Sequence, residues 1–532
     1  MARLRGAVLV AVLVGAAGMS AAGAQPAGAP AQPLGRTAPV RATMEDTAPT
    51  RAYEPPTVLI HPQDAGTVVG GTIELSSGLC RLVRSFDGGR TWAMAEKTPS
   101  PTEFPRCFAG AIYGYLNETP MAWGRNGALY WGISGLNPNR QDRDVSVLVA
   151  RSGNLGDTWT STVVADGRAA TVEPSSISRP VTGLAVDSTS GPEDIVYVGW
   201  QTYPPTGPRL AKIAVSTDGG RTFSEPRTPY DEETSRRLGG SPGLEGLPPQ
   251  MQVAPDGTLY VLFPGRTTDT SFAPRIMLAA SKDQGKTFTV TEVAKVAESN
   301  TTPTFRWAPE GGPNGTLHVV YEDRQARPLG PRDIFYVRST DGGATFSPPR
   351  LINDDDPQKR FTHVNPNMSV APDGRIDLVW WDFRDGAGLY ATDVYYAYSY
   401  DNGQTWSRNF RITERSIDRK LGTWSNNFDY RAPPSVASTR ETALVGWDDT
   451  GLANDVSNTQ DLMFTTVQLK ELPADTSVLP YVIAGLLGLV AGGLALLLIA
   501  ARYNRRKERS VEEPDDISTG RRLSPPSRSP SA

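Results

Sequence analysis

Short apolar runs separated by polar turns recur along most of the chain. The clearest are TLYVLF from Thr258, TLHVVY from Thr316 and RIDLVWW from Arg375. A turn with Asn or Asp before Gly precedes each run, as in Ala254-Pro255-Asp256-Gly257. Asn-Gly and Asp-Gly bends between apolar runs are typical of β-hairpins. The pattern therefore predicts an all-β chain built from short antiparallel strands.

A second repeated element has the pattern Ser-x-Asp-x-Gly-x-Thr followed by Trp or Phe, and one copy is Ser339–Phe346 (STDGGATF). Copies recur roughly every 60 residues along the chain. The Asp can accept hydrogen bonds from backbone N–H groups ahead of it, the Gly tolerates a positive φ, and the ring is suited to burial. We therefore expect structural turns rather than catalytic groups. The third position of the six copies is held by Asp87, Asn154, Asp218, Asp283, Asp341 and Asp401.

A fixed period of strands and turns predicts a β-propeller. Each unit reads as strand, Asp-Gly turn, strand, long loop, strand, Ser-x-Asp box and strand, which is one four-stranded antiparallel blade. We count seven blades, with six as the alternative. The seventh unit has strands at Ala443–Trp447 and Asp461–Thr466 but no box and no fourth strand. We expect the N-terminal segment near residues 40–60 to supply that strand and so cover the exposed edge.

The boxes resemble the Asp-box repeats, or bacterial neuraminidase repeats, of sialidase-like β-propellers, and the resemblance covers about residues 55–470. It implies a glycan substrate whose carboxylate is held by three arginines, a Tyr nucleophile helped by a Glu, and an Asp as acid/base. It implies no cofactor. Two departures oppose this activity: sialidases have six blades, and their early Arg-Ile-Pro motif is replaced here by TVLIHP at Thr57–Pro62.

Both kinds of turn lie on one face of such a propeller, so the long loops gather on the opposite face, where the channel mouth is the default site. The substrate-binding candidates on that face are Arg324, Arg384 and Arg431, with Arg306 and Arg179 behind them. Tyr430 with Glu414 could form the nucleophile pair, and Asp382 or Asp323 could be the acid.

These carboxylates also have a structural interpretation, because they recur at equivalent points of successive blades. Repetition around a ring favours a role in tying loop backbones and neighbouring arginines together. The recurring positions are Asp144, Asp333, Asp393 and Asp461 before third strands, and Asp323, Asp382 and Asp448 after second strands. Tryptophans recur on the second strands, where packing between blades is favoured over stacking on sugars. They are Trp131, Trp200, Trp380, Trp381 and Trp447.

Composition narrows the partners. The net charge of −4 and the lack of a basic cluster in the middle of the chain argue against nucleic acid. The three histidines are far apart and in no ligand spacing, so we predict no metal site. Asp354–Asp356 could take Ca²⁺, but a solvated loop that needs no ion is the favoured interpretation. Cys80 and Cys107 are the only cysteines, and an oxidising compartment favours a disulfide between them.

Both ends of the chain read as targeting segments. A charged start, an apolar stretch and Ala22-Gly23-Ala24 predict a secretory signal. An uncharged run near the C-terminus is long enough to cross a bilayer, and the arginines after it predict a cytoplasmic tail. The predicted organisation is a signal peptide (1–24), an Ala/Pro-rich linker (25–52), the propeller (53–470), a juxtamembrane linker (471–477), a transmembrane helix (478–501) and a disordered tail (502–532).

Two functional hypotheses follow for a type I, single-pass protein of the cell membrane with an extracellular propeller. The first is a glycoside hydrolase of the exo-sialidase type acting on extracellular glycans. The second is a non-catalytic propeller that binds a glycan or a surface protein with the same face. The missing motif and the seventh blade favour the second hypothesis.

Overall fold

The computed structural model has two units, Met1–Glu471 and Leu472–Ala532, which are described separately. The predicted signal peptide, the juxtamembrane linker and the tail beyond residue 502 lie outside the residues that the structure describes. The described residues are 33–43, 51–107, 120–136, 145–167, 181, 183–202, 210–239, 244–246, 249–267, 274–297, 301, 303–309, 315–324, 330–386, 390–422, 432–453, 457, 459–469 and 493–502.

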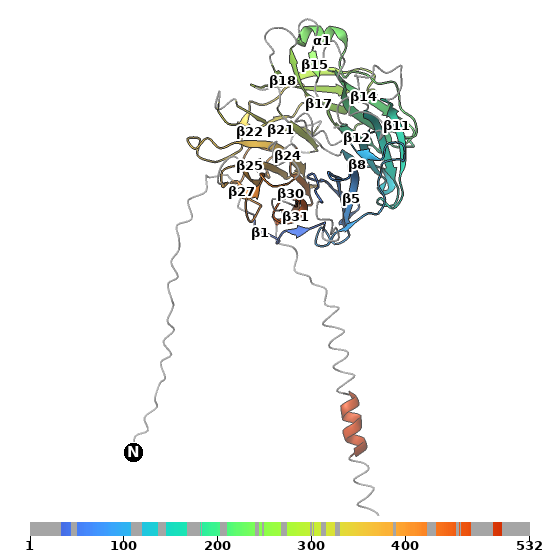
Figure 1. The fold of residues 1–532 in the computed structure, drawn as a ribbon, viewed down its shortest axis with the longest axis vertical. Coiled ribbons are helices and arrows are strands. Elements are labelled where there is room, and N and C mark those ends of the chain that lie inside the picture. The colour runs from blue at the N-terminus through green and yellow to red at the C-terminus, as the bar shows by residue number, and fades with distance from the viewer. Residues whose placement is uncertain are drawn as a thin grey trace, which may run out of the picture. The chain divides into compact units, whose positions relative to one another are not determined.

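Seven antiparallel sheets make up the first unit, and they are arranged in a ring (Figure 1). We number them as blades 1 to 7 in chain order. From the innermost strand outwards, blade 1 contains β3 (Thr57–His61), β4 (Asp64–Glu74), β5 (Leu79–Ser85) and β6 (Ala93–Met94). Blade 2 contains β8 (Met121–Trp123), β9 (Leu129–Leu136), β10 (Val145–Ser152) and β11 (Thr160–Ala165), and β7 (Arg106–Cys107) also pairs with β9. Blade 3 contains β12 (Gly183–Asp187), β13 (Ile195–Thr202) and β14 (Leu210–Ser216).

Blades 4 to 7 follow the same order. Blade 4 contains β16 (Gln250–Val253), β17 (Leu259–Thr267), β18 (Pro274–Ser281) and β19 (Thr289–Lys295), and β15 (Leu244–Gly246) also pairs with β17; blade 5 contains β20 (Thr304–Ala308), β21 (Thr316–Asp323), β22 (Asp333–Ser339) and β23 (Arg350–Leu351). Blade 6 contains β24 (His363–Val370), β25 (Ile376–Asp382), β26 (Ala391–Ser399) and β27 (Phe410–Arg411), and β28 (Ile417–Asp418) also pairs with β26. Blade 7 contains β29 (Ser435–Ser438), β30 (Thr442–Asp449) and β31 (Asp461–Gln468), with β1 (Gly35–Arg36) and β2 (Val40–Arg41) paired to β31. A short helix, α1 (Glu232–Gly239), precedes β15.

The ring is closed at its centre. The innermost strands contact one another in the order β3, β8, β12, β16, β20, β24 and β29, and β29 contacts β3 again. The predicted propeller of seven blades is therefore confirmed, and the six-bladed alternative is wrong.

Packing between blades explains the recurrent tryptophans. All five are less than 2% exposed: Trp131, Trp200, Trp380, Trp381 and Trp447. Neighbouring residues of a strand point to opposite sides of the sheet. Trp380 accordingly packs with Val320 of blade 5, whereas Trp381 packs with Trp447 of blade 7. These rings fill the space between sheets and are not available to stack on a sugar.

The N-terminus completes blade 7. β1 and β2 both pair antiparallel with β31, where Gly35 is opposite Gln468 and Val40 is opposite Phe464. The Thr43 hydroxyl adds a buried hydrogen bond of 2.7 Å to Asp461. The predicted role of the N-terminal segment is confirmed, although β2 lies at the start of the expected range and β1 lies before it. Joining both ends of the chain in one blade removes the last exposed edge of the ring.

The Ser-x-Asp boxes form the expected turns. In the copy of blade 5, the Thr345 backbone N–H and hydroxyl donate to the two oxygens of Asp341, at 3.0 and 2.6 Å. The Gly343 N–H donates to the Ser339 hydroxyl at 2.9 Å. The Thr345 hydrogen bonds lower the pKa of Asp341 to about 2. In the variant copy, the Asn154 amide keeps an equivalent pair of contacts with Thr158, at 2.9 and 3.0 Å.

The same boxes hold neighbouring blades together. Gly343 has a φ of +90°, and a Cβ added there would lie 2.6 Å from Leu278 of blade 4. The Gly at the same position of the blade 6 box, Gly403, would meet Tyr336 of blade 5 in the same way. Glycine is needed at these positions both for the backbone conformation and for the close approach of the next blade.

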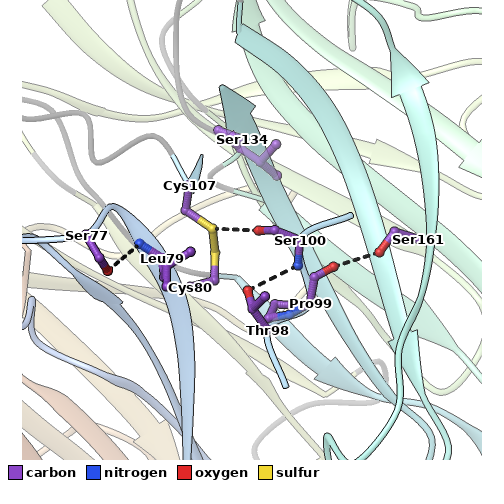
Figure 2. The surroundings of a disulfide bond; sticks show 10 residues. Ser77, Leu79, Cys80, Thr98, Pro99, Ser100, Cys107, Ser134 and Ser161 are labelled. Atoms are coloured by element: carbon purple, nitrogen blue, oxygen red, sulfur yellow. Dashed lines mark hydrogen bonds between the residues drawn. A yellow bond between two sulfur atoms is a disulfide. The ribbon is translucent and has the colours of Figure 1, made fainter. Parts of the chain in front are cut away.

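A disulfide joins the first two blades. Cys80 on β5 is bonded to Cys107 on β7, with 5.6 Å between their Cα atoms, and β7 belongs to the sheet of blade 2 (Figure 2). The Ser100 hydroxyl lies 3.3 Å from the Cys107 sulfur. Closing a loop of this length contributes about 3.5 kcal/mol in the loop-entropy account.

The second unit is described only at residues 493–502, which are helical and exposed. Within the described residues, no helix has both the length and the apolar character needed to span a bilayer. Residues 478–492 of the predicted transmembrane helix lie outside this part of the chain.

The box geometry makes a prediction about acid stability. The folded pKa of Asp341 is below its ordinary value of 3.8, so its ionised form stabilises the fold above about pH 4 and that contribution is lost as the pH falls toward 2. We expect Asp341→Ala to lower the free energy of unfolding by about 1 kcal/mol at pH 7, because a turn-capping acceptor is lost. Asp341→Asn should be nearly neutral, as the Asn154 copy shows an amide making these contacts. Urea unfolding at pH 7 and pH 2.5 would measure this, and an equal loss for both variants at pH 7 would contradict it.

Candidate functional site

The inner strands of all seven blades surround a central channel that contains a cavity of about 340 Å³. Pockets for small ligands measure roughly 300–1,000 Å³. Each inner strand starts on the face that carries the blade-to-blade connections, here called the loop face, and runs toward the face of the Asp boxes. The first residues of the inner strands therefore border the channel mouth on the loop face, and the cavity extends inward to central strand residues such as Arg306 and Asn367. This part of the channel is the candidate site.

The channel has a polar side and an apolar side. Four consecutive blades, 4 to 7, supply most of the polar lining residues, namely Gln250, Gln252, Arg306, Asn367 and Ser435, and blade 1 adds Thr57. Blades 1 to 3 supply mainly apolar ones: Val58, Leu59, Met121, Leu184 and Val186. Arg306 is the only charged lining residue within the described part of the chain, and no lining residue there is a carboxylate. A sugar presents hydroxyls at its edge and C–H groups on its face, and this lining matches both.

Contacts between blades 4 and 5 position the polar side chains. The Gln252 side-chain carbonyl accepts a hydrogen bond from the Trp307 N–H, and the Gln250 amide donates to the Thr304 hydroxyl at 3.4 Å. The Arg306 guanidinium donates to the Phe305 carbonyl at 2.7 Å. The polar side of the channel is therefore held by its own strands before any ligand arrives.

A β-bulge shapes the blade 6 part of the lining. The pairing of β24 with β25 shifts register between Val364 and Asn367. Asn365, inside the bulge, has a φ of +52°, a left-handed conformation that a non-glycine residue adopts at a cost of about 1 kcal/mol or more. Bulges re-aim side chains and are common beside functional sites. Here the bulge brings Asn367 into the channel.

The two carboxylates predicted as possible acids have structural partners. Asp382 is fully buried and accepts hydrogen bonds from the Trp380 indole and the Arg384 backbone N–H, both at 2.9 Å. Asp323 accepts the Ala297 N–H at 2.9 Å. Both side chains hold loop backbone in place, as the recurrence of these positions around the ring suggested. Neither lines the channel.

Arg384 is tied to its own blade and to the preceding connection. Its guanidinium donates to Asp382, to Asp354 at 2.7 Å and to Asn409 at 2.9 Å. It also stacks on the Tyr395 ring at 4.4 Å, and its side chain is only 12% exposed. These contacts direct the predicted substrate-binding arginine away from the channel and give it a structural position.

Of the remaining predicted residues, the structure describes Arg324 and Glu414. Arg324 donates to the Gly330 carbonyl of its own loop at 2.6 Å. Glu414 is exposed and lies 3.4 Å from Arg36 of β1, a strand at the outer edge of blade 7, so it is not at the channel. The other predicted members, Tyr430, Arg431 and Arg179, lie outside the described residues.

Sequence reasoning missed most of the channel lining. Gln250 and Gln252 lie in β16, and Asn367 lies in β24, both of which are inner strands. Polar residues inside a predicted inner strand, as in QMQV, were the available signal, because a strand buried on both sides is mostly apolar.

A second polar group lies beside the bulge. Asp333, Asp355 and His363 each offer a ligand atom within 4.8 Å of the others, so they could hold a metal ion. Burial lowers the pKa of His363, but the Asp355 and Asp382 carboxylates raise it, and the net shift is upward. The spacing of histidines in the sequence gave no indication of this group, because its members meet only through packing of blade 5 against blade 6.

Comparison with known proteins agrees with this architecture. The family described as BNR/Asp-box repeat matches residues 397–408, the box of blade 6. The chain is a seven-bladed β-propeller with a BNR/Asp-box repeat in blade 6. No curated protein matches it.

Similar solved structures include an α-L-arabinofuranosidase of Fusarium graminearum (13% identity, 82% of this chain and 98% of that chain, TM-score 0.42). An α-L-arabinanase of Penicillium chrysogenum (11%, 83% and 100%, TM-score 0.41) and a Hadza microbial sialidase (18%, 74% and 74%, TM-score 0.42) are also similar.

The contacts of Arg384 predict a stability effect. Arg384→Ala leaves the buried Asp382 carboxylate without its charge partner, which we expect to lower the free energy of unfolding by about 3 kcal/mol. Arg408→Ala, at an exposed arginine of the same blade, should change it by less than about 0.5 kcal/mol. Urea unfolding measures both. An Arg384→Ala protein as stable as the control would show that these contacts do not hold the loop face together.

Proposed function

We propose that this protein is an exported, membrane-anchored propeller that binds an acidic glycan at the loop-face mouth of its central channel. The observation that carries the proposal is the composition of the channel lining. Amide and hydroxyl groups and one guanidinium face an apolar wall across the cavity. Amides can bond sugar hydroxyls, the apolar wall can pack against C–H groups, and the planar fork of Arg306 suits a carboxylate.

Binding is favoured over hydrolysis by the position of the carboxylates. Glycoside hydrolysis needs an acid and a second carboxylate, or a Tyr helped by a carboxylate, on either side of the scissile bond. Within the described residues, the channel lining holds no carboxylate, and Asp323 and Asp382 are bonded to loop backbone. Arg384 is also unsuited to a sialidase-type set of three substrate-binding arginines, because its guanidinium is hydrogen-bonded to Asp354 and Asn409.

An ectodomain of residues 25–475 tests this proposal on an array of acidic and neutral glycans. We expect Arg306→Ala to weaken binding to carboxylate-bearing glycans about 10- to 100-fold, since a hydrogen bond to a charged group contributes about 1.5–3 kcal/mol. Arg306→Lys, which keeps the charge and loses the fork, should fall in between. Arg90→Ala, at an exposed arginine of an Asp box, is the matched control and should bind like the unaltered protein.

The same ectodomain is incubated with fluorogenic sialosides, arabinofuranosides and other aryl glycosides. Binding without turnover is the expected outcome. Turnover that Arg306→Ala abolishes would make the channel mouth an active site and overturn the non-catalytic assignment. Absence of binding to every acidic glycan, or unchanged binding by Arg306→Ala, would overturn the proposal as a whole.

The anchor rests on the apolar run at residues 478–501 and the arginines that follow it. The full chain, expressed with its N-terminal signal, is expected in the membrane fraction and should resist alkaline carbonate extraction. A chain ending at residue 475 should instead be released to the medium. Recovery of the full chain in the soluble fraction would remove the anchor from the proposal.

A further inference from the structure

The polar group of Asp333, Asp355 and His363 joins two blades. Asp333 is the first residue of β22 in blade 5, Asp355 lies in the connection to blade 6, and His363 is the first residue of β24. Their side chains are almost inaccessible to solvent, at 0%, 3% and 0% exposed. Asp382, the last residue of β25, brings its carboxylate to 3.5 Å from the His363 Nε2 atom.

The hydrogen bonds of His363 define which nitrogen carries its proton. Nδ1 lies 3.1 Å from the Arg332 carbonyl oxygen, which can only accept, so Nδ1 is protonated. The second nitrogen, Nε2, faces two carboxylates, 3.2 Å from Asp355 and 3.5 Å from Asp382. Nε2 makes no hydrogen bond of acceptable geometry. Carboxylate oxygens at these distances require a positive charge at Nε2, which is supplied either by a proton or by a bound metal ion, and metal loading distinguishes the two.

The surroundings resemble the support of a metal ligand set. A metal-binding histidine usually donates its other N–H to a carbonyl or carboxylate, and ligating carboxylates are themselves hydrogen-bonded. His363 meets the first condition through Arg332. The second is met by the Asn353 amide, which donates to Asp333 at 3.0 Å and to Asp355 at 2.7 Å.

The geometry points to a divalent-metal site formed by His363 Nε2, Asp333 and Asp355, with Asp382 beside it. One imidazole with two or three carboxylates suits Zn²⁺, or Mn²⁺ as its nearest competitor, better than Ca²⁺, which prefers oxygen ligands alone. The ion would clamp the connection and β22 of blade 5 to the start of β24. That start is two residues before Asn365, so the ion would also fix the bulge that brings Asn367 into the channel.

The experiment uses the ectodomain of residues 25–475, stripped with EDTA and then supplied with Zn²⁺, Mn²⁺ or Ca²⁺ one at a time. We expect one tightly bound Zn²⁺ per chain by elemental analysis. We also expect a Tm at least about 3 °C above that of the EDTA-treated protein, because a ligand bound only to the folded state stabilises it. Neither readout depends on a glycan, so this test stands apart from the proposed function.

Variants assign the site. Asp355→Asn and His363→Gln should each lose the Zn²⁺-dependent rise in Tm and the bound ion. Asp356→Asn, at the exposed aspartate next in the chain, is the matched control and should keep both. If His363→Gln does not fold, the Asp355→Asn variant still tests whether the metal binds here. Asp355 lies in a connection rather than in a strand, so its substitution is less disruptive to folding. Equal Tm values with EDTA and with Zn²⁺, or a Zn²⁺-dependent rise that Asp355→Asn retains, would overturn the proposal.

Discussion

A single blade of this propeller has two apolar faces, and both are buried only because a neighbour stands on each side. Trp380 and Trp381, adjacent on β25, point in opposite directions and pack against blades 5 and 7 respectively. Fully burying such a ring removes on the order of 200 Å² from water, so an open end of the array would expose a large apolar surface. This requirement makes closure of the ring the central constraint. It also explains why β31 is covered by strands from the far end of the chain, with Thr43 bonded to Asp461.

The Asp boxes serve that constraint more directly than their hydrogen bonds alone suggest. Within a box, Asp341 and Ser339 hold a turn whose second glycine, Gly343, approaches Leu278 of the preceding blade too closely for any side chain. The box therefore couples the geometry of one blade to the position of its neighbour. The motif identifies a way of packing sheets around an axis and carries no chemistry of its own, which is why it predicts the fold so much better than the activity.

Features that depend on local turn chemistry could be predicted from the sequence, and features that depend on contacts between blades could not. The boxes and Asp-Gly turns predicted six of the blades, because each is specified within a few consecutive residues, and the seventh was predicted from its apolar strands. Arg384 lies on the loop face, and its partners are distant along the chain. Asp354 precedes it by 30 residues and Asn409 follows it by 25. His363 likewise meets Asp333 only because β24 packs beside β22. No spacing rule along the chain reports such encounters.

Several charged residues that the structure describes on the loop face neutralise one another. Arg411 with Asp393 and Arg419 with Asp448 form close pairs with a buried carboxylate, as Arg384 does with Asp382. The oxygens of these buried carboxylates are occupied by guanidinium N–H groups, so these residues are poorly placed to contact a ligand. Any chemistry or recognition must then come from groups outside these pairs. Within the described residues, the inner-strand lining around Arg306 and the group of Asp333, Asp355 and His363 lie outside these pairs.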